Sequence, residues 1–208
     1  MKHRSSRVIA ALAVAVLAAA LGQSVQRLPK IHAIPDTPVG TYMLEFNLKD
    51  LDGKEHRMTD HKGKIIVLCS WSTLCPYSRA IDPYIEELVQ EYADKGVTFY
   101  GVDAQEVFAP VPIRDYLKKN GLTFTILEDP RNYFLRDLKA REVPEFFVVD
   151  QNLRLAYRGS FDDRLAIIDP GNTPFVKNAI DDLLAGRPVA LPKTPFKGCL
   201  TSNLVEDE

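Results

Sequence analysis

Cys75 is the residue whose type and position most clearly indicate chemistry. It lies between a continuous apolar stretch, Ile65–Cys69, and the segment Ser78–Lys95, which has the spacing of an amphipathic helix. A cysteine at a helix N-terminus faces unpaired backbone N–H groups and the positive end of the helix dipole, and both stabilise a thiolate. The sequence therefore predicts that Cys75 is a nucleophilic thiol, although a buried structural cysteine would fit the same position.

The elements that must position Cys75 follow an α/β pattern. Continuous apolar residues indicate central strands, and the 3.6-residue spacing indicates helices covering them. Strands that alternate with helices, then a hairpin and a last helix, predict an α/β sandwich with a mixed sheet. The expected strands are Tyr42–Leu48, His56–Met58, Lys64–Trp71, Val97–Val102, Phe124–Leu127, Phe146–Val149 and Leu153–Tyr157, and the expected helices are Ser78–Lys95, Ile113–Asn120, Tyr133–Ala140 and Pro174–Ala185.

The first 22 residues have the composition of a secretory signal. Three basic residues precede the apolar run Val8–Leu21, and Ala20–Gly22 offers the small residues that a signal peptidase reads. The apolar run of about 14 residues is shorter than a membrane-spanning helix. We expect cleavage after Gly22 and export to the periplasm or the extracellular space, where disulfides persist. An uncleaved membrane anchor is the alternative.

The rest of the chain divides into three parts. Residues 23–39 contain three prolines and form an expected irregular lead-in, and residues 40–186 carry the expected domain. Residues 187–208 show no helical or strand period and contain Cys199. We expect this C-terminal tail to be either loose or laid across the domain surface.

Composition argues against several classes of protein. The 208 residues include 26 Lys+Arg and 28 Asp+Glu, a net charge of −2, whereas a nucleic-acid binder normally carries a basic surplus. Three cysteines are too few for an all-cysteine zinc site, and the four histidines lack partners at metal-ligand spacing. We therefore expect no nucleic-acid partner, no metal and no organic cofactor.

The segment Trp71–Ser78 resembles the active site of the thioredoxin superfamily, especially exported thioredoxins of the TlpA/ResA type and AhpC/TSA (redoxin) proteins. Its sequence, Trp-Ser-Thr-Leu-Cys-Pro-Tyr-Ser, is in register with their Trp-x-x-x-Cys-x-x-Cys motif. Pro83 matches a proline of the first active-site helix, and Val143-Pro144 stands where the family places a cis-proline facing the nucleophile. The resemblance covers residues 40–186 and implies a thioredoxin-like three-layer sandwich with an N-terminal β-hairpin extension.

The departure from this motif is Ser78, which replaces the second cysteine. A hydroxyl cannot form a disulfide, so the usual dithiol cycle is unavailable within the motif. Ser78 either donates a hydrogen bond to the Cys75 thiolate or is an ordinary first-turn residue. The resemblance implies that Pro144 shapes a substrate groove. The residues expected to line the site are Trp71, Pro76, Tyr77 and Val143.

Two other cysteines are candidates for the thiol that resolves an oxidised Cys75. Cys199 lies on the tail, from which it could swing toward an oxidised partner, as distant resolving cysteines do in peroxiredoxin-like proteins. Cys69 lies within an expected strand, where a small buried residue is the simpler interpretation. A disulfide needs a Cα–Cα separation of about 4.4–6.8 Å, which the structure can test. An external thiol is the third alternative.

Two further groups of charged residues lie near the expected site. Glu145 follows Pro144 directly and either faces an incoming substrate or is a charge at a strand edge. Asp162, Asp163 and Arg164 could line the mouth of the site, but a solvated turn is the interpretation we favour.

These observations predict an exported thiol oxidoreductase that uses Cys75 for thiol–disulfide exchange with protein thiols, protein disulfides or a small thiol reductant. A peroxiredoxin-like peroxidase is the first alternative. Ser72 fits the hydroxyl position of such sites, but Leu68 stands at their proline position and Val143-Pro144 replaces their arginine. A non-catalytic thioredoxin-fold binding or assembly module is the second alternative, and a Cys75→Ala variant separates it from both enzymes.

Overall fold

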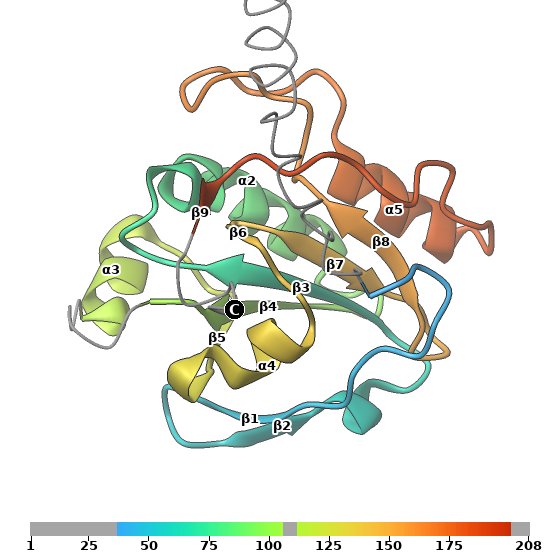
Figure 1. The fold of residues 1–208 in the computed structure, drawn as a ribbon, viewed down its shortest axis with the longest axis horizontal. Coiled ribbons are helices and arrows are strands. Elements are labelled where there is room, and N and C mark those ends of the chain that lie inside the picture. Colours follow the sequence, from blue (N-terminus) through green and yellow to red (C-terminus); the bar gives the residue numbers. More distant parts are fainter. Residues whose placement is uncertain (1–36, 106–111, 201–208) are drawn as a thin grey trace, which may run out of the picture. The chain divides into compact units, whose positions relative to one another are not determined.

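A seven-stranded mixed sheet forms the centre of the computed structural model, which describes residues 37–105 and 112–200 (Figure 1). The strand order is β2-β1-β5-β4-β3-β7-β8. A second sheet of two short strands pairs β6 with β9. The strands are β1 (Asn47–Asp50), β2 (Glu55–Arg57), β3 (Ile65–Trp71), β4 (Val97–Asp103), β5 (Thr125–Glu128), β6 (Glu142–Val143), β7 (Phe146–Val149), β8 (Leu155–Gly159) and β9 (Cys199–Leu200).

Helices cover both faces of the large sheet. Alternate residues of β3 point to opposite faces, so Cys69 and Trp71 join a core cluster with residues of α2 and α5, while Ile66 and Leu68 join a second cluster with residues of α4. This arrangement gives the three layers that the sequence predicts (Figure 1). The helices are α2 (Pro76–Tyr92), α3 (Ile113–Asn120), α4 (Tyr133–Asp137) and α5 (Phe175–Leu184), with short 3-10 helices at Met58–His61 and Pro130–Asn132.

Strand β3 lies in the middle of the sheet and leads to the candidate site. It runs parallel to β4 and antiparallel to β7, and all seven of its residues are buried. Burial on both faces explains why its sequence is continuously apolar rather than alternating. The strand begins at Ile65, one residue later than expected, and ends at Trp71 as expected.

Helix α2 begins earlier than the sequence predicts. Cys75 is its N-cap residue and Pro76 occupies the first helical position, where a missing backbone N–H costs nothing. The expected start at Ser78 was therefore two residues late, and the helix ends at Tyr92 rather than Lys95. The reactive position thus lies at the junction between β3 and α2.

The N-terminal hairpin pairs β1 with β2 and joins the edge of the sheet through β5. The expected strand at Tyr42–Leu48 is wrong in its bounds, because Tyr42 forms an isolated bridge with Arg154 and the strand starts at Asn47. Among the described residues, no helix has the length and apolarity needed to cross a membrane. The expected signal segment and the cleavage position after Gly22 lie outside the described residues.

Candidate active site

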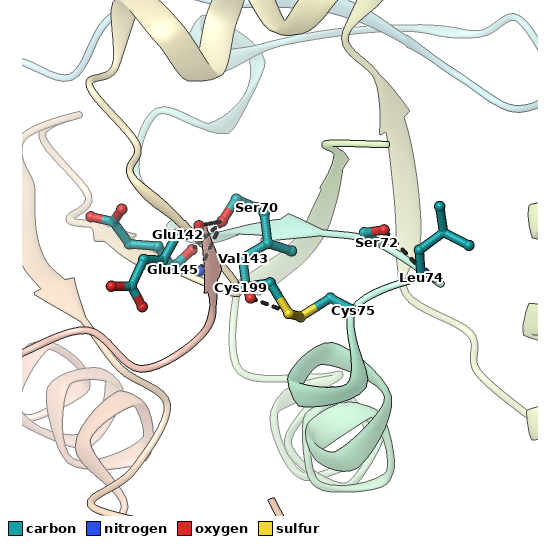
Figure 2. Close-up of a disulfide and its surroundings, with 8 residues drawn as sticks. All are labelled: Ser70, Ser72, Leu74, Cys75, Glu142, Val143, Glu145 and Cys199. Carbon is teal, nitrogen blue, oxygen red and sulfur yellow. Dashed lines mark hydrogen bonds between the residues drawn. A yellow bond between two sulfur atoms is a disulfide. The ribbon is translucent and has the colours of Figure 1, made fainter. Parts of the chain in front are cut away.

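A disulfide between Cys75 and Cys199 forms the centre of the candidate site (Figure 2). The two residues are 124 positions apart, and their Cα atoms are separated by 6.2 Å, within the range that a disulfide requires. Cys75 is 5% exposed and packs against a core cluster of the domain as well as being bonded to the tail. The structure therefore pairs Cys75 with the tail cysteine and not with Cys69.

The backbone of Val143 contacts the same disulfide. The carbonyl oxygen of Val143 lies 2.9 Å from Cys75 Sγ. A disulfide sulfur has no proton to donate, so this is a close contact in the oxidised state, and a reduced Cys75 could donate a hydrogen bond there. The Val143–Pro144 peptide bond is cis, and both residues are buried. The Val143 carbonyl thus lies beside the sulfur, and the cis peptide bond to Pro144 follows it directly.

Strand β9 brings Cys199 to this position by pairing antiparallel with β6. Val143 stands opposite Cys199, and Glu142 stands opposite Leu200. The Glu142 carboxylate also accepts a hydrogen bond from the Gly198 N–H, and burial of this carboxylate raises its pKa. Two-residue strands carry no sequence period, so this pairing was not expected from the sequence.

The tail before Cys199 is attached along the edge of β8. The Arg158 N–H donates to the Pro192 carbonyl at 3.0 Å, and the Thr194 N–H donates to the Arg158 carbonyl at 3.1 Å. The Thr194 hydroxyl lies 2.7 Å from the Tyr157 hydroxyl and accepts from the Ser160 N–H at 3.0 Å. Of the two expectations for the tail, the structure therefore confirms that residues up to 200 lie across the domain surface.

Ser70 fixes the segment that carries Val143 to strand β3. Its hydroxyl donates to the Glu142 carbonyl at 2.7 Å and accepts from the Glu145 N–H at 2.8 Å (Figure 2). Ser70 is fully buried, so these hydrogen bonds form without competition from water. The hydroxyl holds both ends of the four-residue segment 142–145 against the central strand.

Glu145 forms a buried ion pair, and both expectations for it were wrong. Its carboxylate lies 2.6 Å from Arg158 Nε, and both side chains are 0% exposed. It also accepts a hydrogen bond from the Arg141 N–H at 2.8 Å. Glu145 therefore faces neither a substrate nor solvent and instead links the segment after β6 to β8.

Trp71 lies in the core on the side of α2. It is 0% exposed, and its indole N–H donates to Asp82 at 2.8 Å. The Tyr116 hydroxyl donates to the other oxygen of Asp82 at 2.7 Å, and burial raises the pKa of this carboxyl. Trp71 thus supports the junction of β3 and α2 from within, rather than forming an accessible surface of the site.

Cys69 is a buried free thiol. It is 3% exposed, and its sulfhydryl points to the Ser70 carbonyl at 3.3 Å. Burial raises its pKa well above the ordinary value, and the nearby negative charges of Asp82 and Glu145 act in the same direction. The candidate resolving role of Cys69 is therefore wrong for this structure, because the thiol is neither bonded to Cys75 nor accessible.

The remaining motif residues differ in accessibility. Ser78 is fully buried, and its hydroxyl has no hydrogen-bond partner among the described residues, so it does not bond to Cys75 in the oxidised state. Pro76 is exposed and Tyr77 is half-buried. Leu74 is 50% exposed and precedes Cys75 directly, which gives the site an apolar edge.

The loop after β8 contributes a small pocket beside Pro144. Asp162 and Arg164 are 7% and 5% exposed and form an ion pair of 2.7 Å, so the solvated turn expected there was wrong for these two residues. Residues lining the pocket include Tyr77, Ile81, Pro144, Phe161, Asp162 and Lys197.

The two sulfur atoms of the disulfide are groups at this site that can change oxidation state. No group of three or more His, Cys, Asp or Glu residues that could hold a metal ion occurs within residues 37–105 and 112–200. Cys75 and Cys199 together can accept or release two electrons as a disulfide or dithiol pair.

Comparison with known proteins establishes the family. The AhpC/TSA family model matches residues 39–158, and the chain therefore belongs to the AhpC/TSA family. The thiol-disulfide oxidoreductase ResA of Geobacillus thermodenitrificans is 33% identical over 114 residues, which are 55% of this chain and 64% of that relative. The chain thus spans less than two thirds of the length of this relative.

Solved structures show the same fold. The crystal structure of an uncharacterized conserved protein from Geobacillus kaustophilus matches with a TM-score of 0.72 and 27% identity, over 78% of this chain and 90% of that one. A thiol:disulfide interchange protein of the thioredoxin family from Chlorobium tepidum matches with a TM-score of 0.54 and 19% identity, over 72% and 99% of the two chains. The predicted thioredoxin-like α/β fold is confirmed.

Four residues of the site were missed by the sequence analysis. Ser70 and Glu142 become significant through hydrogen bonds between distant segments, which have no local signal in the sequence. Leu74 is part of the motif but has no distinctive spacing. Gly198 has no distinctive signal either, because a glycine in a proline-rich tail fits a turn as well as a close backbone approach.

Proposed function

We propose that this protein is a thiol–disulfide oxidoreductase whose redox pair is Cys75 with Cys199. The observation that carries the proposal is the disulfide itself, which places a tail cysteine on the sulfur that follows the buried strand β3. A tail cysteine thereby replaces the missing second cysteine of the motif. The named relatives, thiol-disulfide oxidoreductases, support the same class of activity.

The reaction proceeds in two exchange steps. The Cys75 thiolate attacks one sulfur of a substrate disulfide, forms a mixed disulfide and releases the other substrate sulfur as a thiolate. The Cys199 thiolate then attacks Cys75 Sγ, forms the intramolecular disulfide and releases the second substrate thiolate. The substrate gains two electrons and the protein loses two, and an external dithiol reduces the protein again. Substrate dithiols can be oxidised by the same steps in reverse.

Three features support Cys75 as the attacking thiol. It is the N-cap residue of α2, where the helix dipole stabilises a thiolate. It lies beside the Val143 carbonyl and the Val143–Pro144 peptide. The free cysteine, Cys69, is buried, and burial raises the pKa of its thiol. We assign the catalytic roles to Cys75 and Cys199, and positioning roles to Val143, Pro144 and Ser70.

The site of action proposed for the protein is outside the cytoplasm. The N-terminal sequence has the composition of a cleavable signal, and a disulfide as resting state suits an oxidising compartment. The partners proposed are protein thiols or disulfides and a thiol reductant.

The experiment that tests this function compares two substrates. Reduction of insulin disulfides by dithiothreitol is followed by turbidity, and hydrogen peroxide consumption is followed in parallel. The wild-type protein is expected to accelerate insulin reduction, and Cys75→Ala to abolish the acceleration. Rapid peroxide consumption without insulin reduction would establish the peroxidase instead, and no activity toward either would favour a binding module.

A further inference from the structure

The tail has two parts that are held in different ways. Residues 192–195 are attached by hydrogen bonds to Tyr157, Arg158 and Ser160, including a bond of 2.5 Å from the Ser160 hydroxyl to the Pro195 carbonyl. We call residues 192–195 the anchored part. Residues 196–200, the releasable part, are held chiefly by the two-residue pairing with β6 and by the disulfide. Breaking the disulfide therefore removes a main attachment of residues 196–200, whereas the hydrogen bonds of residues 192–195 do not depend on it.

Close packing shows that the anchored part belongs to the fold. A Cβ atom at Gly159 would overlap Thr194 Oγ1 and lie 2.9 Å from the Thr194 backbone nitrogen. A side chain at position 159 is therefore incompatible with the tail as it lies. With the anchored part attached, three residues (196–198) separate Pro195 from Cys199, so the Cα atom of Cys199 can lie at most about 14 Å from that of Pro195.

The releasable part occupies the surface that a substrate must reach. Cys75 is nearly inaccessible, and its sulfur lies between the Val143 carbonyl and Cys199. The position of Cys199 Sγ is the one that the structure shows for a sulfur bonded to Cys75, and the substrate sulfur is placed there. The disulfide between the domain and its own tail therefore resembles the mixed disulfide that the domain would form with an extended substrate peptide.

The residue before the bonded cysteine lies in a place with no room for a side chain. A Cβ atom at Gly198 would overlap the Val143 carbonyl oxygen and lie 2.7 Å from the carbonyl carbon and 3.1 Å from Pro144 N. These are backbone atoms, fixed by the hydrogen bonds of Ser70 to the segment 142–145. They cannot move aside as the end of a flexible side chain would.

We propose that the groove along Val143–Pro144 binds extended peptides in which a glycine directly precedes the reacting cysteine, and that residues 196–200 compete with such peptides for this groove, most strongly while the disulfide holds them there. This inference rests on the proposed function. The substrate strand pairs antiparallel with β6, as β9 does, and its glycine N–H donates to the Glu142 carboxylate. Phe196, whose ring centroid lies 5.5 Å from Arg158 Cζ, and Lys197, which lines the pocket beside Pro144, mark where the two preceding substrate side chains lie.

The test uses full-length protein with Cys199→Ser, so that no internal disulfide can form. Two peptides, Phe-Lys-Gly-Cys-Leu and Phe-Lys-Ala-Cys-Leu, carry a 2-thiopyridyl group on the cysteine sulfur. Attack by the Cys75 thiolate on that sulfur forms the Cys75–peptide disulfide and releases thiopyridone, which is followed by absorbance while mass spectrometry identifies the adduct. We expect the glycine peptide to react faster on the order of tenfold, the effect of overpacking one methyl group at a closed site.

A second variant tests the competition by the tail. Gly198→Ala, added to Cys199→Ser, prevents the releasable part from seating on Val143, and the glycine peptide is expected to react several times faster. Leu191→Ala, at an exposed tail residue, is the matched control and leaves the rate unchanged. Cystamine, a small disulfide, checks that the Cys75 thiol has the same intrinsic reactivity in all variants.

The outcomes separate this inference from the proposed function. If both peptides react at equal rates, or if Gly198→Ala leaves the rate unchanged, the groove does not select for glycine or is not occupied by the tail, and the inference is overturned. If neither the peptides nor cystamine form a disulfide with Cys75, the proposed function fails first.

Discussion

Cys69 lies near the end of β3 and Cys75 lies six residues later at the start of α2, yet their surroundings differ in almost every respect. Cys75 caps a helix, contacts a backbone carbonyl and is bonded to Cys199. Cys69 lies within β3 on the face toward α2, and burial raises the pKa of its thiol. Strand alternation places Cys69 in the core, whereas the chain leaves the strand before Cys75, so that its sulfur can meet a partner.

Two residues of the same type thus differ because one lies within the strand and the other lies beyond its end, at the start of a helix. Both cysteines are nearly inaccessible in the oxidised structure, at 3% and 5% exposure. Cys75, however, is bonded to a cysteine of the tail, whereas Cys69 packs within the core cluster of β3, α2 and α5. We therefore expect reduction to free the Cys75 thiol from the tail and to leave Cys69 buried.

The largest expected effect comes from removing the two thiols separately. Cys75→Ala is expected to abolish formation of mixed disulfides with protein partners, because the attacking sulfur is gone. Cys69→Ala is the matched control and is expected to keep the exchange rate within about twofold of wild type, with a loss of stability from the small core cavity. Trapped partners are counted by mass spectrometry after acid quenching. If Cys69→Ala lost the partners and Cys75→Ala kept them, the assignment of the two thiols would be reversed.

The next effect separates attack from resolution. Cys199→Ser keeps the attacking thiol, so the first exchange step proceeds, but the mixed disulfide has no internal thiol to break it. We expect partner adducts to accumulate and turnover to fall at least about tenfold, because a tethered thiol acts at an effective concentration in the millimolar range. Non-reducing electrophoresis and insulin turnover measure the two quantities. Normal turnover of Cys199→Ser would show that an external thiol resolves Cys75.

A moderate effect on stability follows from the long loop that the disulfide closes. The bond joins residues 124 positions apart and thereby restricts the unfolded chain, so the oxidised protein is expected to be more stable than the reduced one by about 2–4 kcal/mol. Urea unfolding with and without dithiothreitol measures the difference, and Cys199→Ser is expected to match the reduced wild type. Equal stability of the oxidised and reduced forms would contradict a disulfide between the tail and the domain.

The smallest expected effect concerns Asp82, a buried carboxyl in the core on the same face of the sheet as Cys69. Burial raises the pKa of Asp82, so the folded state favours its protonated form. The resulting stabilisation is complete below the ordinary pKa near 3.8 and is lost as the pH rises through the raised value. We expect Asp82→Asn to remove this pH dependence, so that the variant loses less stability than wild type between pH 4 and pH 7 in urea unfolding. A larger loss in the variant would contradict the direction of the shift.

Sequence patterns predicted the elements with strong periods and missed the contacts between distant segments. The continuous apolar run gave β3 to within one residue, and the bounds of α3 and β7 were correct. The start of α2 was late because Pro76 reads as an interruption, although the first helical position tolerates proline. The pairing of β6 with β9 and the Glu145–Arg158 pair depend on tertiary contacts, which neither residue type nor spacing reveals.

The site was also predicted only in part, because local motifs can be read from the sequence and contacts between distant segments cannot. The motif identified Cys75 and the segment Val143–Pro144, because their local sequence resembles a known family. The partner of Cys75 stayed open among three alternatives, since the position of a tail without any period cannot be read from the sequence. The structure selects Cys199 through the attachment of residues 192–195 along β8.

A redox titration measures whether Cys75 and Cys199 form the one reversible redox pair proposed for them. The protein is equilibrated with dithiothreitol buffers of graded potential, quenched with acid, alkylated and digested, and the state of each cysteine is measured by mass spectrometry. We predict that Cys75 and Cys199 change together in a single two-electron transition while Cys69 stays a thiol throughout. Separate transitions of Cys75 and Cys199, or a disulfide that contains Cys69, would show that the two cysteines are not one redox pair.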